Sequence, residues 1–290
     1  MGLNYDKMLG VDRRWIYLLI FIAIAIPTLF PLRLPVQVTS DVRGVFDEIE
    51  ALPDGSHIFI AVDYEPGTRP EMDPMSTAVL LHCFMKKLKV VSISYVVYGA
   101  GVAEHLFKET ERLYTEQTGE ELVYGEDYCY LGFKPGEYAM IIKLGQDIKE
   151  TCKQDGYNID VYTLPILKEK NKLGDYPYMV NLHDDSYADM WILYGHERTG
   201  LKMGSVCTAV MASGMYPFIQ AGQLTGVVGG LKGGSEYEQL LNEKYDLKKP
   251  LVKATAGMDI QSVIHILIIL LMLLGNFAYI MKSRQEKKQS

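Results

Sequence analysis

Residues 57–99 read "HIFIAVDYEPGTRPEMDPMSTAVLLHCFMKKLKVVSISYVVYG" and hold the pattern that decides the fold. Two short apolar runs, 57–64 and 90–99, lie on either side of a segment with a helical start. Asp73 is placed as an N-cap, Pro74 suits the first helical position, and lysines near the far end favour the helix dipole. This order predicts a strand, a helix and a second strand.

The same alternation continues on both sides of this unit. Ser40 is placed to cap one helix, and Gly119 to end another. The expected helices cover 40–52, 73–89, 103–119, 138–153 and 186–200, and the expected strands cover 57–64, 90–99, 176–185 and 204–213. Strands that alternate with helices predict an α/β domain with a doubly wound, mostly parallel sheet covered on both faces.

Two uncharged apolar runs, 15–32 and 262–281, flank this domain. Each approaches the length of about 20 residues that crosses a bilayer, and neither has a polar face for water, so we expect two transmembrane helices. The first run could instead be a cleaved signal peptide. Its apolar stretch is long for that, and no small-residue cleavage pattern follows, so a signal anchor is favoured. Pro27 and Pro31 predict a kink and an exit from the bilayer.

Basic residues flank both runs and predict the orientation. Arg13 and Arg14 precede Trp15, and Lys282 and Arg284 follow the second run, so these residues are expected at the membrane interface with both termini cytoplasmic. Lysines just before the second run weaken the asymmetry without reversing it. The expected organisation is a cytoplasmic tail 1–14, a signal anchor 15–32, an extracytoplasmic domain 33–261, a transmembrane helix 262–281 and a basic cytoplasmic tail 282–290. Membrane lipid is therefore a partner, in the plasma membrane.

The net charge limits the class of partner, and the cysteines bear on metal sites and disulfides. The whole chain has a net charge of −7, and removing the two basic tails leaves about −11 on the central domain. Because phosphate contacts need clustered Lys and Arg, nucleic acid is excluded as a partner. The four cysteines at 83, 129, 152 and 207 form no CxxC pair. An oxidising exterior would permit disulfides, but their apolar surroundings favour buried free thiols.

Acidic residues and a histidine follow two of the expected strands. Asp63 and Glu65 come after the first strand, and His183, Asp184 and Asp185 come after a later one. Ligands of α/β sheets gather beyond the carboxyl ends of the strands, where these residues could bind a divalent cation or supply an acid and a base. No HExxH or GxSxG motif supports catalysis, and polar strand ends are ordinary in this fold class. We expect no cofactor, and the sequence leaves a metal open.

Two loops offer weaker candidates. The turn "GAG" at 99–101 could present backbone amides to an anion. The segment 124–138 is dense in tyrosine, and is either a recognition loop or a packed turn around "KPGE". The packed turn is favoured, because tyrosine is frequent throughout this chain.

The stretch "AGQLTGVVGGLKGGSEYEQL", residues 221–240, is the richest in glycine. It fails the GxxxxGK[ST] pattern of a phosphate loop. A third transmembrane segment over 203–231 is disfavoured by its polar residues and Pro217. Glycines recur at every fourth position, Gly222, Gly226, Gly230 and Gly234. On a helix they would form a ridge for close packing or oligomerisation. Alternatively they form a loop, and a helix starts only where Ser235 caps it.

Taken together, these features favour a two-pass membrane protein that presents an acidic α/β domain outside the cytoplasm. Without a strong catalytic motif, the expected function is a structural or accessory subunit of an oligomeric membrane complex. The alternative is a membrane-anchored hydrolase or ligand-binding domain that uses the carboxylates and the histidine at the strand ends.

Overall fold

The computed structural model describes residues 12–30, 32 and 34–289 of the chain. These divide into two compact units. One is the central domain, Val36–Ala254, and the other combines the segments before and after it. Each unit is described by itself.

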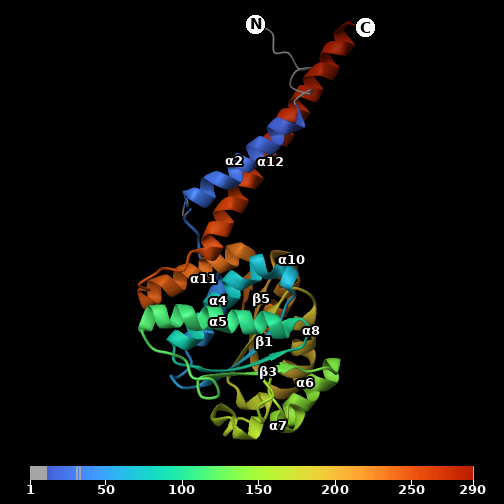
Figure 1. The fold of residues 1–290 in the computed structure, drawn as a ribbon. Helices are drawn as coiled ribbons and strands as arrows, with labels where there is room; N and C mark the ends of the chain where they lie inside the picture. The colour runs from blue at the N-terminus through green and yellow to red at the C-terminus, as the bar shows by residue number, and fades with distance from the viewer. Residues whose placement is uncertain (1–11, 31, 33, 290) are drawn as a thin grey trace. The chain divides into compact units, whose positions relative to one another are not determined.

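A parallel sheet forms the centre of the domain, with its described strands in the order β3-β2-β1-β4-β5-β6 (Figure 1). The strands are β1 His57–Asp63, β2 Lys89–Ser94, β3 Tyr128–Phe133, β4 Tyr178–His183, β5 Lys202–Cys207 and β6 Val227–Gly229. Every adjacent pair is parallel. The predicted α/β class with a parallel sheet is thus confirmed. The chain runs outward from β1 in one direction and from β4 in the other, so the order reverses between these two strands.

Helices cover both faces of the sheet (Figure 1). The helices of the domain are α3 Ser40–Glu50, α4 Arg69–Met85, α5 Gly99–Thr118, α6 Glu137–Gln146, α7 Ile148–Thr151, α8 Tyr187–Met190, α9 Glu197–Thr199, α10 Ala209–Gln220 and α11 Gly230–Tyr245, with a π-helical turn η5 Trp191–His196 and the short 3-10 turns η1 Pro66–Thr68, η2 Val161–Thr163, η3 Pro165–Leu167 and η4 Leu173–Asp175. Residues of α3, α4, α5 and α11 share one hydrophobic core, and residues of α6, η5 and α10 share the other.

The sequence of β1 shows why the sheet is buried on both sides. Its alternate residues enter different cores, with Ile58 and Ile60 on one face and Phe59 and Ala61 on the other. A strand buried on both faces is apolar throughout, as a covered parallel sheet requires. Such strands end in polar residues where they leave the sheet, and Asp63 is the last residue of β1.

Three boundaries differ from the prediction. α4 begins at Arg69, one turn before Asp73, with Pro70 in its first turn. The Asp73 carboxylate accepts from the Arg69 Nε at 2.9 Å and does not cap the helix. Pro74 therefore lies inside α4. The segment 124–138 contains a whole strand, β3, whose glycine and tyrosines resemble a turn in sequence. The stretch 204–213 is extended only to Cys207, after which α10 begins.

The apolar runs form helices of different length in the second unit. α2 spans Arg13–Leu29, contains Pro27 and is shorter than the roughly 20 residues of a span. Pro31 lies outside the described residues. α12 spans Lys253–Gln289. Among the described helices it is the one long and apolar enough to cross a membrane, and 6% of its most apolar window is buried.

All four cysteines, at 83, 129, 152 and 207, lie in the described part of the domain as buried free thiols. The predicted free state is confirmed. Their burial between the sheet and its helices raises the pKa of each thiol, so none has the thiolate character that reactivity requires.

A buried histidine joins three helices on one face of the sheet. His82 of α4 contacts Glu50 of α3 through Nε2 at 3.0 Å and the hydroxyl of Tyr237 of α11 through Nδ1 at 2.7 Å. Its ring stacks on Phe46, with the centroids 4.3 Å apart. Burial lowers the pKa of His82 to about 4, despite the raising effect of Glu50. His82 is therefore neutral in the folded domain near pH 7.

This network predicts acid destabilisation. The pKa of His82 is lower in the folded domain than in the unfolded chain. The stabilisation of the fold by neutral His82 is therefore complete above pH 6.5 and is lost as the pH falls towards 4. The full effect is at most about 3 kcal/mol, at 1.36 kcal/mol per pKa unit. The free energy of unfolding of the full chain in detergent, measured with urea between pH 7 and 4, should show this loss.

The variant His82→Leu should have a flatter pH profile over the same interval, because the titrating group is gone. His105→Leu is the matched control, since the side chain of His105 is half exposed on α5. An unchanged slope in His82→Leu would mean that another group carries the acid sensitivity.

Candidate functional site

The predicted acidic residues meet at one edge of the sheet. Asp63 and His183 are register partners at the ends of β1 and β4, where the strand order reverses. Glu65, Asp184 and Asp185 lie in the loops that follow these two strands. In open α/β sheets this reversal is where ligands bind. The five residues thus lie at or just after the ends of β1 and β4, and their contacts decide what they can do.

Asp63 is fully buried and receives three N–H donors. Its Oδ1 accepts from the backbone N–H of Tyr95 at 2.6 Å. Its Oδ2 accepts from Asn181 Nδ2 at 2.8 Å and Trp191 Nε1 at 2.7 Å. Burial raises the pKa of Asp63 to about 7, against these donors, which favour the ionised form. One carboxylate thus connects β1 with the end of β2, with β4 and with η5.

Asn181 can form a hydrogen bond with Asp63 in either protonation state of the carboxyl group. Its Oδ1 is buried and has no hydrogen-bond partner within the described part of the chain. An amide can present either its NH₂ group or its oxygen after a flip. Asn181 therefore suits an ionised Asp63, which accepts, and also a neutral Asp63, which needs an acceptor for its O–H.

His183 forms a buried pair with a serine. Its Nδ1 lies 2.6 Å from the backbone carbonyl of Asp185, which can only accept, so Nδ1 carries the proton. Its Nε2 then accepts from the Ser205 hydroxyl at 2.8 Å. Burial lowers the pKa of His183 to about 4. This is the hydrogen bond of a nucleophile and its base. However, both side chains are 0% exposed, so a substrate cannot reach the hydroxyl.

Asp184 closes the turn after β1. Its Oδ2 accepts from the backbone N–H of Glu65 at 2.8 Å and from the Thr68 hydroxyl at 2.6 Å. Nucleotide-binding sheets place a phosphate on the backbone amides of this first turn. A similar contact starts α10, where Glu71 Oε1 accepts from the backbone N–H of Ala209 at 2.8 Å. The domain's own carboxylates therefore occupy donors that an anionic ligand would use.

The same contacts bear on the cation hypothesis. Among the described residues, no three His, Cys, Asp or Glu side chains converge as a metal-binding group. Glu65 and Asp185 are exposed, and Asp185 accepts from the backbone N–H of Ser186 at 2.7 Å. Asp63, Asp184 and Asp185 thus each accept from a backbone N–H.

The first glycine of the turn at 99–101 is packed against protein. Gly99 begins α5, and a Cβ added there would lie 1.6 Å from the Ser94 hydroxyl oxygen. Ser94 in turn donates to the Val62 carbonyl at 2.7 Å. Gly99 thus packs against β1 and β2, and its N–H donates to the Val96 carbonyl at 3.0 Å, while Ala100 and Gly101 are exposed.

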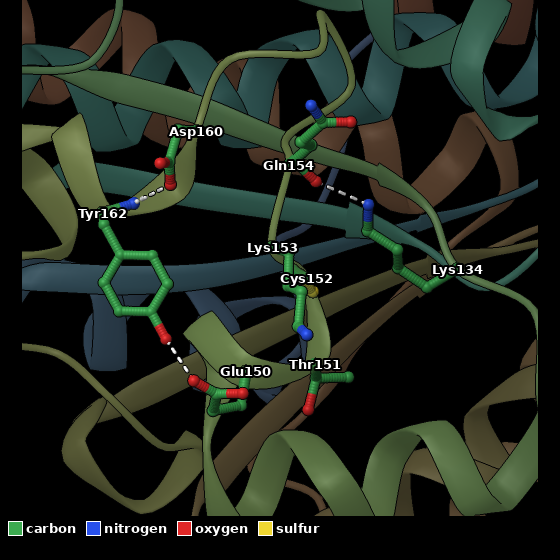
Figure 2. A pocket seen from close by; sticks show the side chains of 8 residues that line it. All are labelled: Lys134, Glu150, Thr151, Cys152, Lys153, Gln154, Asp160 and Tyr162. Carbon is green, nitrogen blue, oxygen red and sulfur yellow. Dashed lines mark hydrogen bonds between the residues drawn. The ribbon is translucent and has the colours of Figure 1, made fainter.

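The hollows of the surface lie elsewhere. The largest of three, of about 980 Å³, follows β3, and Figure 2 shows its eight lining residues. Four of them are already bonded to one another, since Lys134 Nζ donates to the Gln154 carbonyl at 2.7 Å and the Tyr162 hydroxyl donates to Glu150 at 2.5 Å (Figure 2). Its Cys152 thiol has a pKa raised by burial to about 12.

The other two hollows measure about 540 Å³ beside the first and about 430 Å³ between α4 and α5. In the latter, Arg69 pairs with Asp73 at 2.9 Å and Lys253 with Glu109 at 2.7 Å. Asp63, His183 and Ser205 line none of these three described hollows.

The four spaced glycines do not share a helix, so the predicted glycine ridge is wrong. Gly222 ends the turn after α10 with φ +75°, and Gly226 precedes β6. Only Gly230 and Gly234 belong to α11. Ser235 does not cap this helix; it is buried inside it and its hydroxyl donates to the Lys232 carbonyl at 2.7 Å.

Close packing is nonetheless what three of these glycines provide. A Cβ at Gly226 would lie 2.0 Å from the Asp41 carbonyl oxygen of α3. A Cβ at Gly230 would lie 2.7 Å from the Ala209 Cβ, and one at Gly234 would lie 2.9 Å from the Ala254 Cβ. The contacts join elements of one chain, and a role in oligomerisation stays a prediction.

The Asp63 contacts predict a specific cost for Asp63→Asn. An asparagine has one acceptor oxygen, so its NH₂ group must face at least one of the three donors. A buried N–H then loses its acceptor, at a cost of about 1–3 kcal/mol in the free energy of unfolding. Urea unfolding of the full chain in detergent measures the loss. Glu65→Gln, at an exposed position of the next loop, is the control and should be neutral. Equal stability of both variants would contradict a stabilising role for the three hydrogen bonds that Asp63 accepts.

Gly226→Ala should destabilise the domain by about 2 kcal/mol or more, because the methyl group overlaps a backbone oxygen that cannot move alone. Gly214→Ala is the matched control. Gly214 lies in α10 with nothing within 4 Å of an added Cβ, so alanine should stabilise the helix by up to about 1 kcal/mol. Thermal unfolding followed by circular dichroism separates the two. Shifts of the same sign would show that the packing space at Gly226 is misjudged.

Comparison with known proteins gives no match. No protein-family description fits the chain, and neither the curated proteins nor the solved structures contain a significant match. The strand order is that of dinucleotide-binding doubly wound sheets, but strand order alone does not transfer a function. The chemistry of this site therefore follows from its own contacts.

Proposed function

We propose that this chain is a membrane-anchored protein whose α/β domain serves as a structural or accessory subunit of an oligomeric membrane complex. The observation that carries the proposal is α12, a long apolar helix with few buried residues in its apolar window. An exposed apolar helix of this length needs lipid or another apolar helix around it, because water does not solvate it.

The proposed topology has two spans. The second is 262–281 within α12, and the first is 15–32, of which α2 covers all but the last residues. Arg13 and Arg14 before the first span, and the basic tail 282–290 after the second, favour cytoplasmic termini in the plasma membrane. The domain 33–261 is then extracytoplasmic.

The closed strand ends support a role without catalysis. At the reversal between β1 and β4, Asp63, His183 and Ser205 are fully buried. His183 is hydrogen-bonded to Ser205, and Asp63 accepts from Asn181. Asp184 occupies the amide of the first turn. An anchored hydrolase or ligand-binding domain would need at least one of these groups to reach a ligand. The contacts therefore favour the subunit over this alternative.

Anchoring at both ends also suits a subunit. A domain tied to the bilayer before residue 36 and after residue 254 has little freedom to tumble. Such a restraint lowers the entropic cost of binding a neighbour in the same membrane, because part of the orientational freedom is already lost.

The mass of the full chain, extracted from its own membranes in mild detergent, tests this proposal. We expect a homo- or hetero-oligomer without a stoichiometric divalent ion, measured by light scattering and by metal analysis of the same sample. Leu273→Arg, in the exposed apolar part of α12, should lower recovery in the membrane fraction, since a central arginine costs about 2.5–3.5 kcal/mol on insertion.

Leu193→Arg is the matched control, because Leu193 is an exposed leucine of the domain. It should leave both membrane recovery and mass unchanged. A monomer that carries stoichiometric zinc, calcium or another divalent ion would overturn the subunit and direct attention back to the carboxylates at the strand ends.

A further inference from the structure

Helix α10 presents an uncharged surface. The stretch 203–231, which contains α10, has no charged residue. Of the helix itself, Ala209–Gln220, only Met215 is buried, while Val210 is 84% exposed and Tyr216 is 46% exposed. Surface helices of water-soluble domains carry charged or polar residues on their outer face. An outer face without any charge suits a contact with something less polar than water.

The position of α10 identifies a nearby surface. A Cβ at Gly230 would meet Ala209 at the start of α10, and one at Gly234 would meet Ala254 in the first turn of α12. Gly230 and Gly234 are four residues apart on α11, a separation of about 6 Å along the helix. The starts of α10 and α12 therefore pack on successive turns of one helix, within the central domain.

Ala254 is also fixed to this domain by a hydrogen bond. Its backbone N–H donates to Glu238 Oε1 of α11 at 2.8 Å. The apolar run of α12 begins at Ser262, eight residues later, which is about 12 Å along an α-helix. A headgroup layer adds about 5–8 Å to each side of the hydrocarbon core. Measured along α12, the polar edge of the bilayer thus begins within about 4–7 Å of Ala254.

We propose that the exposed face of α10 rests on the headgroup layer of the bilayer that α12 crosses. This inference depends on the proposed function only in requiring that α12 spans a membrane. The contact is made by apolar and aromatic groups, Val210, Tyr216 and Pro217. Tyrosine favours the membrane–water interface, where its ring is sheltered and its hydroxyl is solvated.

The charge of α10 sets the lipid chemistry. Since 203–231 contains no lysine or arginine, anionic lipids gain no ion pair with this surface. The contact is therefore with neutral phospholipid, and neither salt nor added phosphatidylserine changes it. A basic amphipathic helix would respond to both.

A single labelled cysteine tests the contact. Val210→Cys adds an exposed thiol, while the four native thiols are buried with raised pKa values, so a maleimide fluorophore labels position 210 selectively. Val123→Cys is the matched control. Val123 is a half-exposed valine that precedes β3, the strand at the far edge of the sheet from β6. The labelled full chains are reconstituted into phosphatidylcholine vesicles that contain a headgroup nitroxide lipid.

The label at 210 should be quenched several-fold more than the label at 123, equally at low and high salt and with or without phosphatidylserine. Equal quenching at the two positions overturns the inference. Disulfide cross-linking between two chains at 210, with no quenching, also overturns it, because a second copy then covers α10.

An alkaline carbonate wash of the same vesicles separates the two proposals. If the chain resists the wash but the two labels are quenched equally, the membrane anchor stands and only the α10 contact is contradicted. A chain that the wash removes has no spanning α12, and both proposals then fail together.

Discussion

The buried carboxylate of Asp63 is the contact on which the strand-end architecture depends. A parallel sheet ends in loops whose backbone donors have no ladder partner, and buried donors must be satisfied. Asp63 satisfies the Tyr95 amide and orders the Trp191 and Asn181 side chains around one point. Its raised pKa reflects the cost of burying a charge there. A domain maintains such a group where several elements would otherwise separate.

Asp184 and Glu71 satisfy backbone N–H donors of neighbouring turns in the same way. Each places a carboxylate on a backbone N–H at the end of a strand or the start of a helix. These are the positions at which related sheet orders bind phosphate, because amide donors and helix dipoles attract negative charge. In this domain, the carboxylates of Asp184 and Glu71 supply the negative charge that a bound phosphate would bring. The acidic character of the domain is thus used in part for its own stability, since the Glu65 and Ala209 amides already have carboxylate acceptors.

The sequence predicted the sheet because its strong signals are local. β1 and α5 show apolar periodicity and clear end residues, and Gly119 ends α5 with φ +83° as expected. The function of Asp63 was not predictable, because its partners Asn181 and Trp191 are distant in the chain. Asn181 within "YMVNLH" is a polar residue in an apolar strand, which was the available signal. β3 was missed since its tyrosines and Gly132 have the composition of a turn.

For the glycine stretch, the sequence predicted close packing, which is found, and a single helix, which is not. Four-residue spacing suggested one helix, but β6 interrupts it. The close packing is present, since Gly226, Gly230 and Gly234 all lie closer to neighbouring elements than a side chain would allow. What they bring together is α3, α10 and the first turn of α12 around α11. The same short segment thus connects the core of the domain, its uncharged outer helix and the origin of the apolar helix. At Gly230 the space that a side chain would fill is taken by Ala209, and at Gly234 it is taken by Met75 and Ala254, so the absence of a Cβ at these two positions is what lets the elements meet.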